Sequence, residues 1–484
     1  MIRMIRGLLS LYSPRYPTVL TYMLQSTEYR AGPYLAWFWR TNDFSRVMYR
    51  RTLDRTRAAR LLLLALRFGM LLQIAAGLTL SGCWYWGELT GGWQFGLAVL
   101  LSYPLVWAHL AALPLTAGRW LIVVPRQRRL IKKSEKVFRQ HKGVKIAIAG
   151  SYGKTSMKEL LLTVLSEGKK VAATPANKNV PISHAYFARK LSGNEDVLLI
   201  EYGEGGPGDI RRFRRVTHPT HAVVTGIAPA HLDRYKTIER AAKDIFSVAG
   251  FVAPSNVFVN VESPLTDQLL RKNKKYQGYS RDGALGWKIQ DVHIAVTGTD
   301  FTLVKGGQTL QLHSGLIGRH QVGPLAFAAV LAKELGLSDA QIKSGIAKTV
   351  PFEHRMRPYQ LNGAWIIDDT YNGNLEGVKA GTALLKELPA KRKLYITPGL
   401  VDQGGQAKAV HEQMGRLIAG AEPDTVVLMK NSAAPDIARG LQAAGYKGEV
   451  QIEDNPLDYY THLQAFIAAG DVVLMQNDWT DNYA

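Results

Sequence analysis

The sequence has almost no cysteine, which excludes a disulfide framework. Cys83 is the only cysteine among 484 residues, and it lies in an apolar run where a thiol behaves as a small hydrophobic side chain. A lone thiol fits a reducing compartment. Fixed-period repeats and low-complexity tracts are also missing. At this length we expect two or three domains with full hydrophobic cores rather than a small stapled scaffold.

Acidic residues are scarce in the first third of the chain. Residues 1–145 hold 22 Lys and Arg against 5 Asp and Glu, whereas the remainder holds 38 against 34. The formal net charge of +21 therefore comes mainly from the N-terminal region. Because the rest of the chain is nearly neutral, a nucleic-acid enzyme is a poor interpretation, and we expect no nucleic-acid partner.

Two long stretches of this basic region have no charged residue. Residues 68–87 and 89–118 are each long enough to cross about 30 Å of hydrocarbon as a helix. Basic residues precede the first stretch and follow the second, so the positive-inside rule predicts a two-helix transmembrane hairpin at 61–124 with both outer ends in the cytoplasm. A pair of buried core helices is the alternative. The predicted location is the cell membrane, as a multi-pass protein with the lipid bilayer as a partner.

The segments on either side of the predicted hairpin are basic. Residues 1–60 are expected to form a cytoplasmic or interfacial segment that lies along the inner leaflet or caps the hairpin, with an RNA-binding arm as an alternative. Residues 125–143 are expected to form a basic linker. A cleaved signal peptide does not fit, because the apolar stretches begin too far from Met1.

From Val144 onward, short β-branched runs alternate with helical stretches, which predicts an α/β fold with a mainly parallel sheet. An antiparallel insertion is expected between Val292 and Leu312, and a second α/β domain begins near Ala364 after a linker at 351–358. The predicted strands are Lys145–Ala149, Val197–Glu201, Ala222–Thr225, Val257–Val261, Trp365–Asp368, Lys393–Thr397, Thr425–Met429 and Asp471–Gln476.

A glycine-rich loop with a lysine follows the first of these strands and opens a helix, which is the context of a phosphate-binding loop. Backbone N–H groups in such a loop close around phosphate oxygens. The ammonium of Lys154 adds positive charge, and the hydroxyl of Thr155 can reach Mg²⁺. The loop residues predicted to bind nucleotide are Gly150, Ser151, Gly153, Lys154, Thr155 and Ser156.

A carboxylate ends the next predicted strand, where Glu201 is followed by a glycine-rich segment. Side chains at the carboxyl ends of parallel strands point toward the ligand crevice. Glu201 is therefore the first candidate ligand for Mg²⁺.

The order of these motifs resembles the Mur ligase family, and within it the MurF ligases. The loop has the family's shortened Gly-x-x-Gly-Lys-Thr form, followed by Met157-Lys158-Glu159. The resemblance covers roughly residue 144 to the C-terminus. It implies a P-loop Mur-ligase central domain at 144–355 and a Rossmann-like α/β C-terminal domain at 356–484. The other matching segments, in the family's order, are Thr174–Pro181, Leu199–Gly203 with its continuation to Ile210, Ala230–Asp233, Ala242–Phe246, Gly318–Pro324 and Ile367–Asn374.

The resemblance also implies cofactors and site residues. The cofactors are ATP and two Mg²⁺ ions, the second held by His231 and by Lys243 as a carbamate, whose oxygens suit a hard cation. The implied metal ligands are Thr155, Glu201, His231 and Lys243, and the implied catalytic residues are Lys154, Glu201, His231, Lys243 and Arg355. The remaining nucleotide contacts are Gln321, Arg355, Asp369, Tyr371 and Asn372, and the substrate contacts are Asn177, Asn179 and Asn374.

The resemblance further implies a reaction. Such ligases phosphorylate a carboxylate with ATP, and an amine then attacks the acyl phosphate to form an amide, so no side-chain nucleophile is needed. The implied partners are a peptidoglycan precursor, linked to a nucleotide or to a lipid, and an amine of the D-Ala-D-Ala type.

Several departures from the family's pattern keep alternatives open. Gln321 and Pro324 stand where the family has asparagines near adenine, and the predicted hairpin takes the place of the family's uridine-nucleotide-binding domain. One alternative is a ligase with another acceptor, as in folylpolyglutamate or cyanophycin synthetases. The other is a non-catalytic nucleotide-binding scaffold at the membrane.

Overall fold

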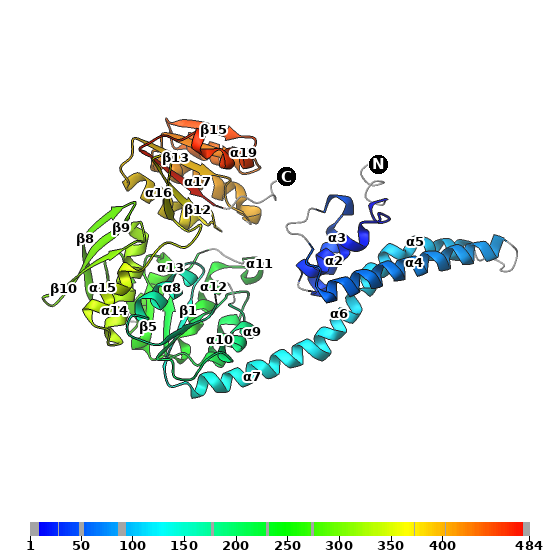
Figure 1. Ribbon diagram of the computed structural model, residues 1–484, viewed down its shortest axis with the longest axis horizontal. Coiled ribbons are helices and arrows are strands. Elements are labelled where there is room, and N and C mark those ends of the chain that lie inside the picture. The colour runs from blue at the N-terminus through cyan, green and yellow to red at the C-terminus, as the bar shows by residue number, and fades with distance from the viewer. Residues whose placement is uncertain are drawn as a thin grey trace. The chain divides into compact units, whose positions relative to one another are not determined.

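The computed structural model consists of two compact units, Met1–Arg129 and Leu130–Ala484 (Figure 1). The residues it describes are 9–27, 29–47, 53–85, 93–175, 179–228, 232–272, 275–371, 373–401 and 403–477.

The first unit is built on two apolar helices, α4 (Arg57–Tyr85) and α5 (Trp93–Leu110), which pack along each other. Close contact is possible because small residues face the partner helix: a Cβ at Gly77 would lie 2.9 Å from the Cβ of Leu100. The chain continues through α6 (Ala112–Gly118) and a π-helical stretch, η2 (Arg119–Val123).

Described residues of the N-terminal sixty form α2 (Tyr16–Ser26), α3 (Ala31–Arg40) and η1 (Phe44–Arg46), which pack against α4 and α5 through a shared apolar cluster. Three tyrosines fasten them to α5. Tyr12, Tyr16 and Tyr34 donate to the backbone carbonyls of Leu101 (2.7 Å), Pro104 (3.0 Å) and Ala108 (3.0 Å). This segment therefore packs against the C-terminal half of α5.

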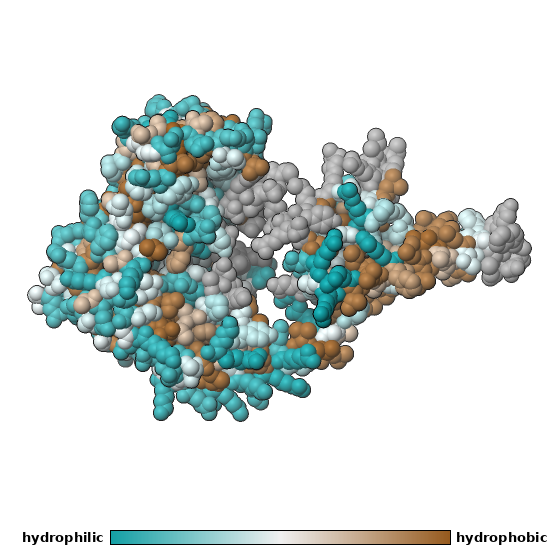
Figure 2. All heavy atoms as spheres, in the orientation of Figure 1, coloured by the Kyte–Doolittle hydropathy of each residue, from teal (hydrophilic) through white to brown (hydrophobic). Residues whose placement is uncertain are grey.

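Large apolar side chains are exposed along α4 and α5, and Figure 2 shows them as a brown surface. Two helical segments, Ala59–Gly82 and Trp93–Gln140, are long and apolar enough to cross a membrane. Length and composition are the only basis for this, and the core helices of soluble proteins meet the same criterion. The helix pair is thus found where it was predicted, but its passage through a membrane is not established.

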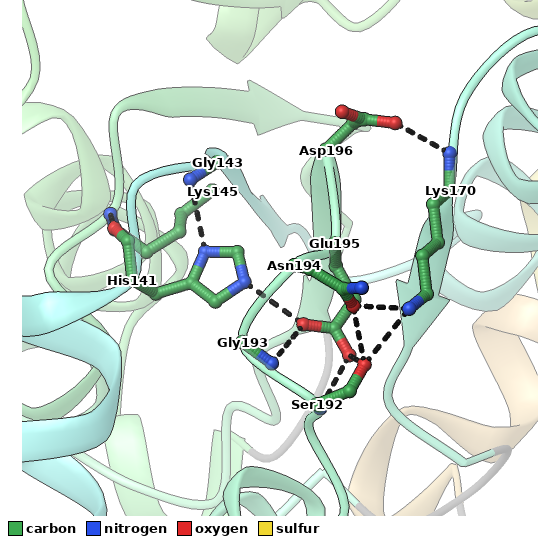
Figure 3. A network of polar contacts seen from close by, with 9 residues as sticks. All are labelled: His141, Gly143, Lys145, Lys170, Ser192, Gly193, Asn194, Glu195 and Asp196. Atoms are coloured by element: carbon green, nitrogen blue, oxygen red, sulfur yellow. Dashed lines mark hydrogen bonds and ion pairs between the residues drawn. The ribbon is translucent and has the colours of Figure 1, made fainter.

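Helix α7 (Val124–Gln140) leads into the first strand through a network of polar contacts (Figure 3). His141 Nε2 lies 3.1 Å from Glu195 Oε2, and the side chains of both residues are almost fully buried. Glu195 also accepts hydrogen bonds from the backbone N–H groups of Ser192 (2.7 Å) and Gly193 (2.9 Å). The network satisfies the polar groups where α7 meets the amino-terminal edge of the sheet.

We expect Glu195→Gln to lower the free energy of unfolding by about 2–3 kcal/mol at pH 7. Burial would raise the pKa of Glu195, but hydrogen bonds from Ser192, from backbone N–H groups and from His141 outweigh it and lower the pKa to about 2. A depressed pKa stabilises the fold above the carboxylate's ordinary value of 4.5, and the effect fades as the pH falls toward 2.

Urea denaturation of wild type and Glu195→Gln at pH 7 and pH 3 tests this assignment. The difference between the two proteins should shrink to about half at pH 3. Glu449→Gln, which changes an exposed carboxylate, is the control. An equal difference at both pH values would contradict the assignment.

The central sheet of the second unit has ten strands in the order β10-β9-β8-β7-β6-β5-β4-β1-β3-β2. Strands β2 to β6 and β1 run parallel, and β7 to β10 are antiparallel. Their bounds are β1 Val144–Ala149, β2 Val171–Ala173, β3 Val197–Glu201, β4 His221–Val224, β5 Val257–Asn260, β6 Gln277–Ser280, β7 Gly283–Ala284, β8 Trp287–Ala295, β9 Gly298–Lys305 and β10 Gln308–Ser314.

Helices cover both faces of this sheet. Successive residues of a strand point to opposite faces, so each strand contributes to two apolar clusters. Ile146 and Ile148 of β1 belong to one apolar cluster, and Ala147 and Ala149 to another. The first cluster is completed by α8 (Lys154–Leu165), α14 (Arg319–Glu334) and α15 (Asp339–Ala347), and the second by α9 (Pro181–Ala188), α10 (Asp209–Thr217) and α12 (Ile238–Phe246). Short helices α11 (Leu232–Tyr235) and α13 (Pro264–Lys272) lie in the connections.

The C-terminal part has its own six-stranded sheet in the order β11-β12-β16-β13-β14-β15. Only β11 is antiparallel. The strands are β11 Arg357–Leu361, β12 Ala364–Asp369, β13 Arg392–Thr397, β14 Thr425–Met429, β15 Glu449–Glu453 and β16 Asp471–Gln476, and the main helices are α16 Leu375–Glu387, α17 Ala407–Gly420, α18 Ala434–Ala443 and α19 Pro456–Thr461. The α/β fold class is therefore confirmed for both parts.

Candidate nucleotide and ligase site

Three adjacent strands of the central sheet carry the candidate site at their carboxyl ends. Gly150 follows β1, Glu201 ends β3, and Thr225 follows β4. Since β1 pairs in parallel with both β3 and β4, these ends lie side by side at one edge of the sheet. Ligands of open α/β sheets bind at such an edge.

The phosphate loop connects β1 to α8. Gly153, with φ +75°, is in the left-handed region and caps α8 without a side-chain hydrogen bond. A Cβ at Gly150 would collide with Oγ1 of Thr225, so the loop needs glycine at this close approach. Thr225 Oγ1 also donates to the carbonyl of Tyr152 at 2.5 Å. The loop is thus held in shape by a neighbouring strand, with the N-terminus of α8 directed at the sheet edge.

Lys154 is paired with a carboxylate that the motifs did not indicate. Its ammonium donates to the carbonyl of Gly150 (2.6 Å) and to Glu204 Oε1 (2.9 Å), and Glu204 Oε2 lies 2.8 Å away. The exposed fractions of the two side chains are 12% and 5%. The charge of the phosphate-binding lysine is therefore balanced inside the protein.

Glu201 is the centre of a second cluster of polar side chains. Thr155 Oγ1 donates to its two carboxylate oxygens at 3.0 and 3.2 Å, and the fully buried ammonium of Lys158 lies 3.2 Å from Oε2. Asn179 Nδ2 is 3.5 Å from Oε1. Thr155, Asn179 and Lys158 thus surround the carboxylate of Glu201, and Lys158 is the one of the three that the motifs did not indicate as a site residue.

His184 contacts the backbone of Glu201. Its Nε2 lies 2.8 Å from the carbonyl of Glu201, to which it can donate. Complete burial lowers the pKa of His184 to about 4, so the ring is neutral at pH 7. It therefore fixes the end of β3 without adding charge to the site.

The glycine-rich loop after Glu201 is fastened by α11 and α12. Arg234 donates to the carbonyl of Gly205 (2.6 Å), Tyr235 Oη lies 3.0 Å from the carbonyl of Gly206, and Asp244 accepts from the N–H of Gly208 (3.0 Å). Asp244 thus faces the loop from α12.

Lys243, the next residue on α12, is exposed. Adjacent helical residues point about 100° apart, so the side chain of Lys243 leaves α12 in a different direction from that of Asp244. The sequence expectation for Lys243 as a carbamate-bearing metal ligand stays a prediction.

Asp369, Arg355 and Tyr371 lie together where the C-terminal part begins. Burial raises the pKa of Asp369 to about 6, although it accepts a hydrogen bond from Gln476 Nε2 at 2.7 Å. The guanidinium of Arg355 lies 4.7 Å from the ring centre of Tyr371.

Asn374 is the N-cap of α16 and accepts a hydrogen bond from the N–H of Gly377 at 2.9 Å. It therefore has a structural role, and its contact with substrate stays a prediction.

The segment expected to contact adenine forms the first turns of α14. Gln321 Nε2 lies 3.0 Å from His320 Nε2, and Pro324 is inside the helix. Burial lowers the pKa of His320 to about 4. The role of Gln321 toward adenine stays a prediction.

Three expected site residues, His231, Asn177 and Asn372, lie outside the described residues, as does the side chain of Cys83. Within the described ranges, no group of three or more His, Cys, Asp or Glu side chains is placed to hold a metal by itself. The hydroxyl of Thr155 and the carboxylate of Glu201 nevertheless fit one Mg²⁺ ion, whose remaining ligands would be phosphate oxygens and water.

Two pockets border this sheet at opposite edges. One, of about 260 Å³, is lined by Lys154, Asn179, Glu204, Asp209 and Phe213 among others, and belongs to the site. The other, of about 470 Å³, lies beside Gly143 and Val197 at the amino-terminal strand ends. The smaller pocket is therefore the functional candidate.

Comparisons with known proteins agree with the motifs. Residues 148–332 match the Mur ligase middle domain, and residues 354–476 match the glutamate ligase domain of Mur ligases. A UDP-N-acetylmuramoyl-tripeptide–D-alanyl-D-alanine ligase of Escherichia coli is 29% identical over 308 residues, which are 61% of this chain and 67% of the relative.

Solved structures show the same fold. MurF from Acinetobacter baumannii superimposes with a TM-score of 0.63 at 20% identity, over 73% of this chain and 77% of the other. MurF from Thermotoga maritima in complex with ADP gives a TM-score of 0.62 at 23% identity, over 73% and 80%.

The predicted location as a multi-pass protein of the cell membrane is wrong on these findings. The relative is named as a ligase of a UDP-linked muramoyl-tripeptide, and a nucleotide carrier makes such a precursor water-soluble. Two apolar helices, judged by length and composition alone, do not establish a multi-pass membrane protein. The similarity to these ligases gives no support for the lipid bilayer as a partner.

Proposed function

We propose that this chain joins a D-alanyl-D-alanine-type amine to the terminal carboxylate of a UDP-linked muramoyl-tripeptide. The chain carries the middle and C-terminal domains of the Mur ligases and is a MurF-like, ATP-dependent ligase of a peptidoglycan precursor. The carboxylate would first be phosphorylated by ATP. The amine nitrogen, in its neutral form, would then form the new C–N bond as the C–O bond to phosphate breaks, and the proton it loses would leave with the phosphate or pass to solvent.

One observation carries the proposal. The lysine of the phosphate loop and the Thr155–Glu201 pair lie at one edge of a parallel sheet, next to a pocket that can admit a second substrate. Phosphoryl transfer needs mainly positioning and charge neutralisation, and this arrangement provides both.

Each residue then has a defined task. Backbone N–H groups of the loop and of the first turn of α8 would hold phosphate oxygens, and Lys154 would neutralise their charge. Thr155 and Glu201 would hold Mg²⁺, which supplies further charge neutralisation when bound. Arg355, Asp369 and Tyr371 would contact the nucleotide.

A second Mg²⁺ held by His231 and a carbamate on Lys243 remains part of the proposal. Its support is the two motifs at 230–233 and 242–246, and the side chain of Lys243 is exposed. If the carbamate is required, Lys243→Ala should lose activity and a short-chain carboxylic acid added to the assay should restore part of it.

The test of the function is release of ADP and phosphate from ATP in the presence of Mg²⁺, UDP-linked muramoyl-tripeptide and D-Ala-D-Ala, with mass spectrometry of the product. Turnover should require the metal and both substrates besides ATP, and should give the pentapeptide form. ADP release with a different amine, such as glutamate, would reject the proposed acceptor, and ATP binding without turnover in any mixture would favour the scaffold alternative.

A further inference from the structure

We propose that Glu204 is an exchangeable partner of Lys154 that becomes the binding group for the ammonium of the incoming amine when ATP takes the lysine. The amine half of this inference rests on the proposed function. The exchange half does not, because it concerns only Lys154, Glu204 and phosphate.

The exchange follows from the contacts of Lys154. A single ammonium contacts Glu204 through both carboxylate oxygens, at 2.9 and 2.8 Å, in a site from which most water is excluded. A phosphate bound in the loop needs the same ammonium. Carboxylate and phosphate therefore compete for the positive charge of Lys154, and we expect a bound nucleotide to draw the ammonium away from Glu204.

The backbone that carries Glu204 is held in place, which limits how far its carboxylate can follow the lysine. The carbonyls of Gly205 and Gly206 and the N–H of Gly208 are held by Arg234, Tyr235 and Asp244. The side chain of Lys154 is long and has several rotatable bonds. The movement on exchange is thus mainly that of the lysine.

After the exchange, Glu204 is a buried carboxylate in need of a cation. Its exposed fraction is 6%, and its Oε2 accepts no hydrogen bond of suitable geometry even from Lys154. A buried charge left without a partner is strongly destabilised. Glu204 lines the pocket of about 260 Å³ and therefore favours a ligand that brings positive charge into it.

The same pocket carries a second acidic group. Asp209, the first residue of α10, also lines it. Burial raises the pKa of Asp209, and nearby Asp244 acts in the same direction, whereas Arg212 and Arg234 oppose it. A primary ammonium, with three N–H donors, suits a pocket with two carboxyl groups. The amine of the proposed reaction enters as such an ammonium.

The order of binding follows from these steps. With Lys154 on Glu204, the ammonium site is already occupied by the protein's own cation. With Lys154 on phosphate, the site is open to the substrate. ATP should therefore increase the affinity for the amine, and by linkage the amine should increase the affinity for ATP.

The experiment compares wild type with Glu204→Gln, Glu204→Asp and the control Glu449→Gln, an exposed carboxylate on β15. Binding of ATP is measured by calorimetry with a non-hydrolysable analogue and Mg²⁺. Glu204→Gln should bind the analogue about fivefold to tenfold more tightly, because no carboxylate competes for Lys154. Unchanged or weaker binding would overturn the exchange.

Amine binding is measured in the same way, with D-Ala-D-Ala added before and after the analogue. In wild type the analogue should increase amine affinity by about tenfold, and Glu204→Gln should abolish this increase while Glu204→Asp retains part of it. An increase that survives in Glu204→Gln would overturn the amine half. If wild type turns over no amine at all, the proposed function fails, whereas the nucleotide measurement still decides the exchange.

Discussion

Lys154→Ala is expected to lower the rate of ADP formation by about a thousandfold or more. The ammonium already contacts the backbone of the phosphate loop, at 2.6 Å from the carbonyl of Gly150. Without it, negative charge that develops on the transferred phosphoryl group is left to the backbone and the metal. The measurement is steady-state ADP release with saturating precursor and amine.

A loss of activity in this variant needs to be separated from a loss of folding. Removing Lys154 leaves the buried carboxylate of Glu204 without its partner, which by itself destabilises the protein. The double variant Lys154→Ala/Glu204→Gln removes both charges, so its melting temperature should recover while its activity stays low. Recovery of activity in the double variant would contradict the role of Lys154. Lys447→Ala, at an exposed lysine, is the control.

The strands that bear the site were predictable because they are buried on both faces. Runs such as 197–201 and 471–476 are almost wholly apolar, and the structure has strands at the same residues. The strands that the sequence did not indicate are short or exposed. β2 has three residues, and β15 lies at a sheet edge, has polar residues at three of its five positions and is exposed along most of its length. Partner strands stabilise these segments, and a local pattern cannot show that.

The site was predictable where a motif fixes the backbone and not where a contact joins distant residues. Gly150, Lys154 and Glu201 follow from strand, loop and helix order. Glu204 is one glutamate in a glycine-rich loop, and only the fold brings it to Lys154, fifty residues earlier. The spacing of Lys154 and Lys158, one helical turn, was the available signal that both face β3.

Glu201→Gln is expected to lower kcat by about a hundredfold and to raise the Mg²⁺ concentration for half-maximal activity by about tenfold. The substitution keeps the size of the side chain, so Thr155 can still donate to an oxygen at this position. It removes the negative charge that a hard cation requires. Titration of ADP release with Mg²⁺ measures both quantities.

The same substitution should also destabilise the fold, for a reason unrelated to the metal. Lys158 is fully buried, and Glu201 is one of its two carboxylate partners, at 3.2 Å, the other being Glu159. Loss of one partner should cost about 2 kcal/mol, less than for a buried pair with no substitute. Glu201→Gln/Lys158→Met should restore the melting temperature and leave the Mg²⁺ response weak. If the double variant instead regains the wild-type Mg²⁺ response, Glu201 serves to compensate Lys158 and the metal ligand lies elsewhere.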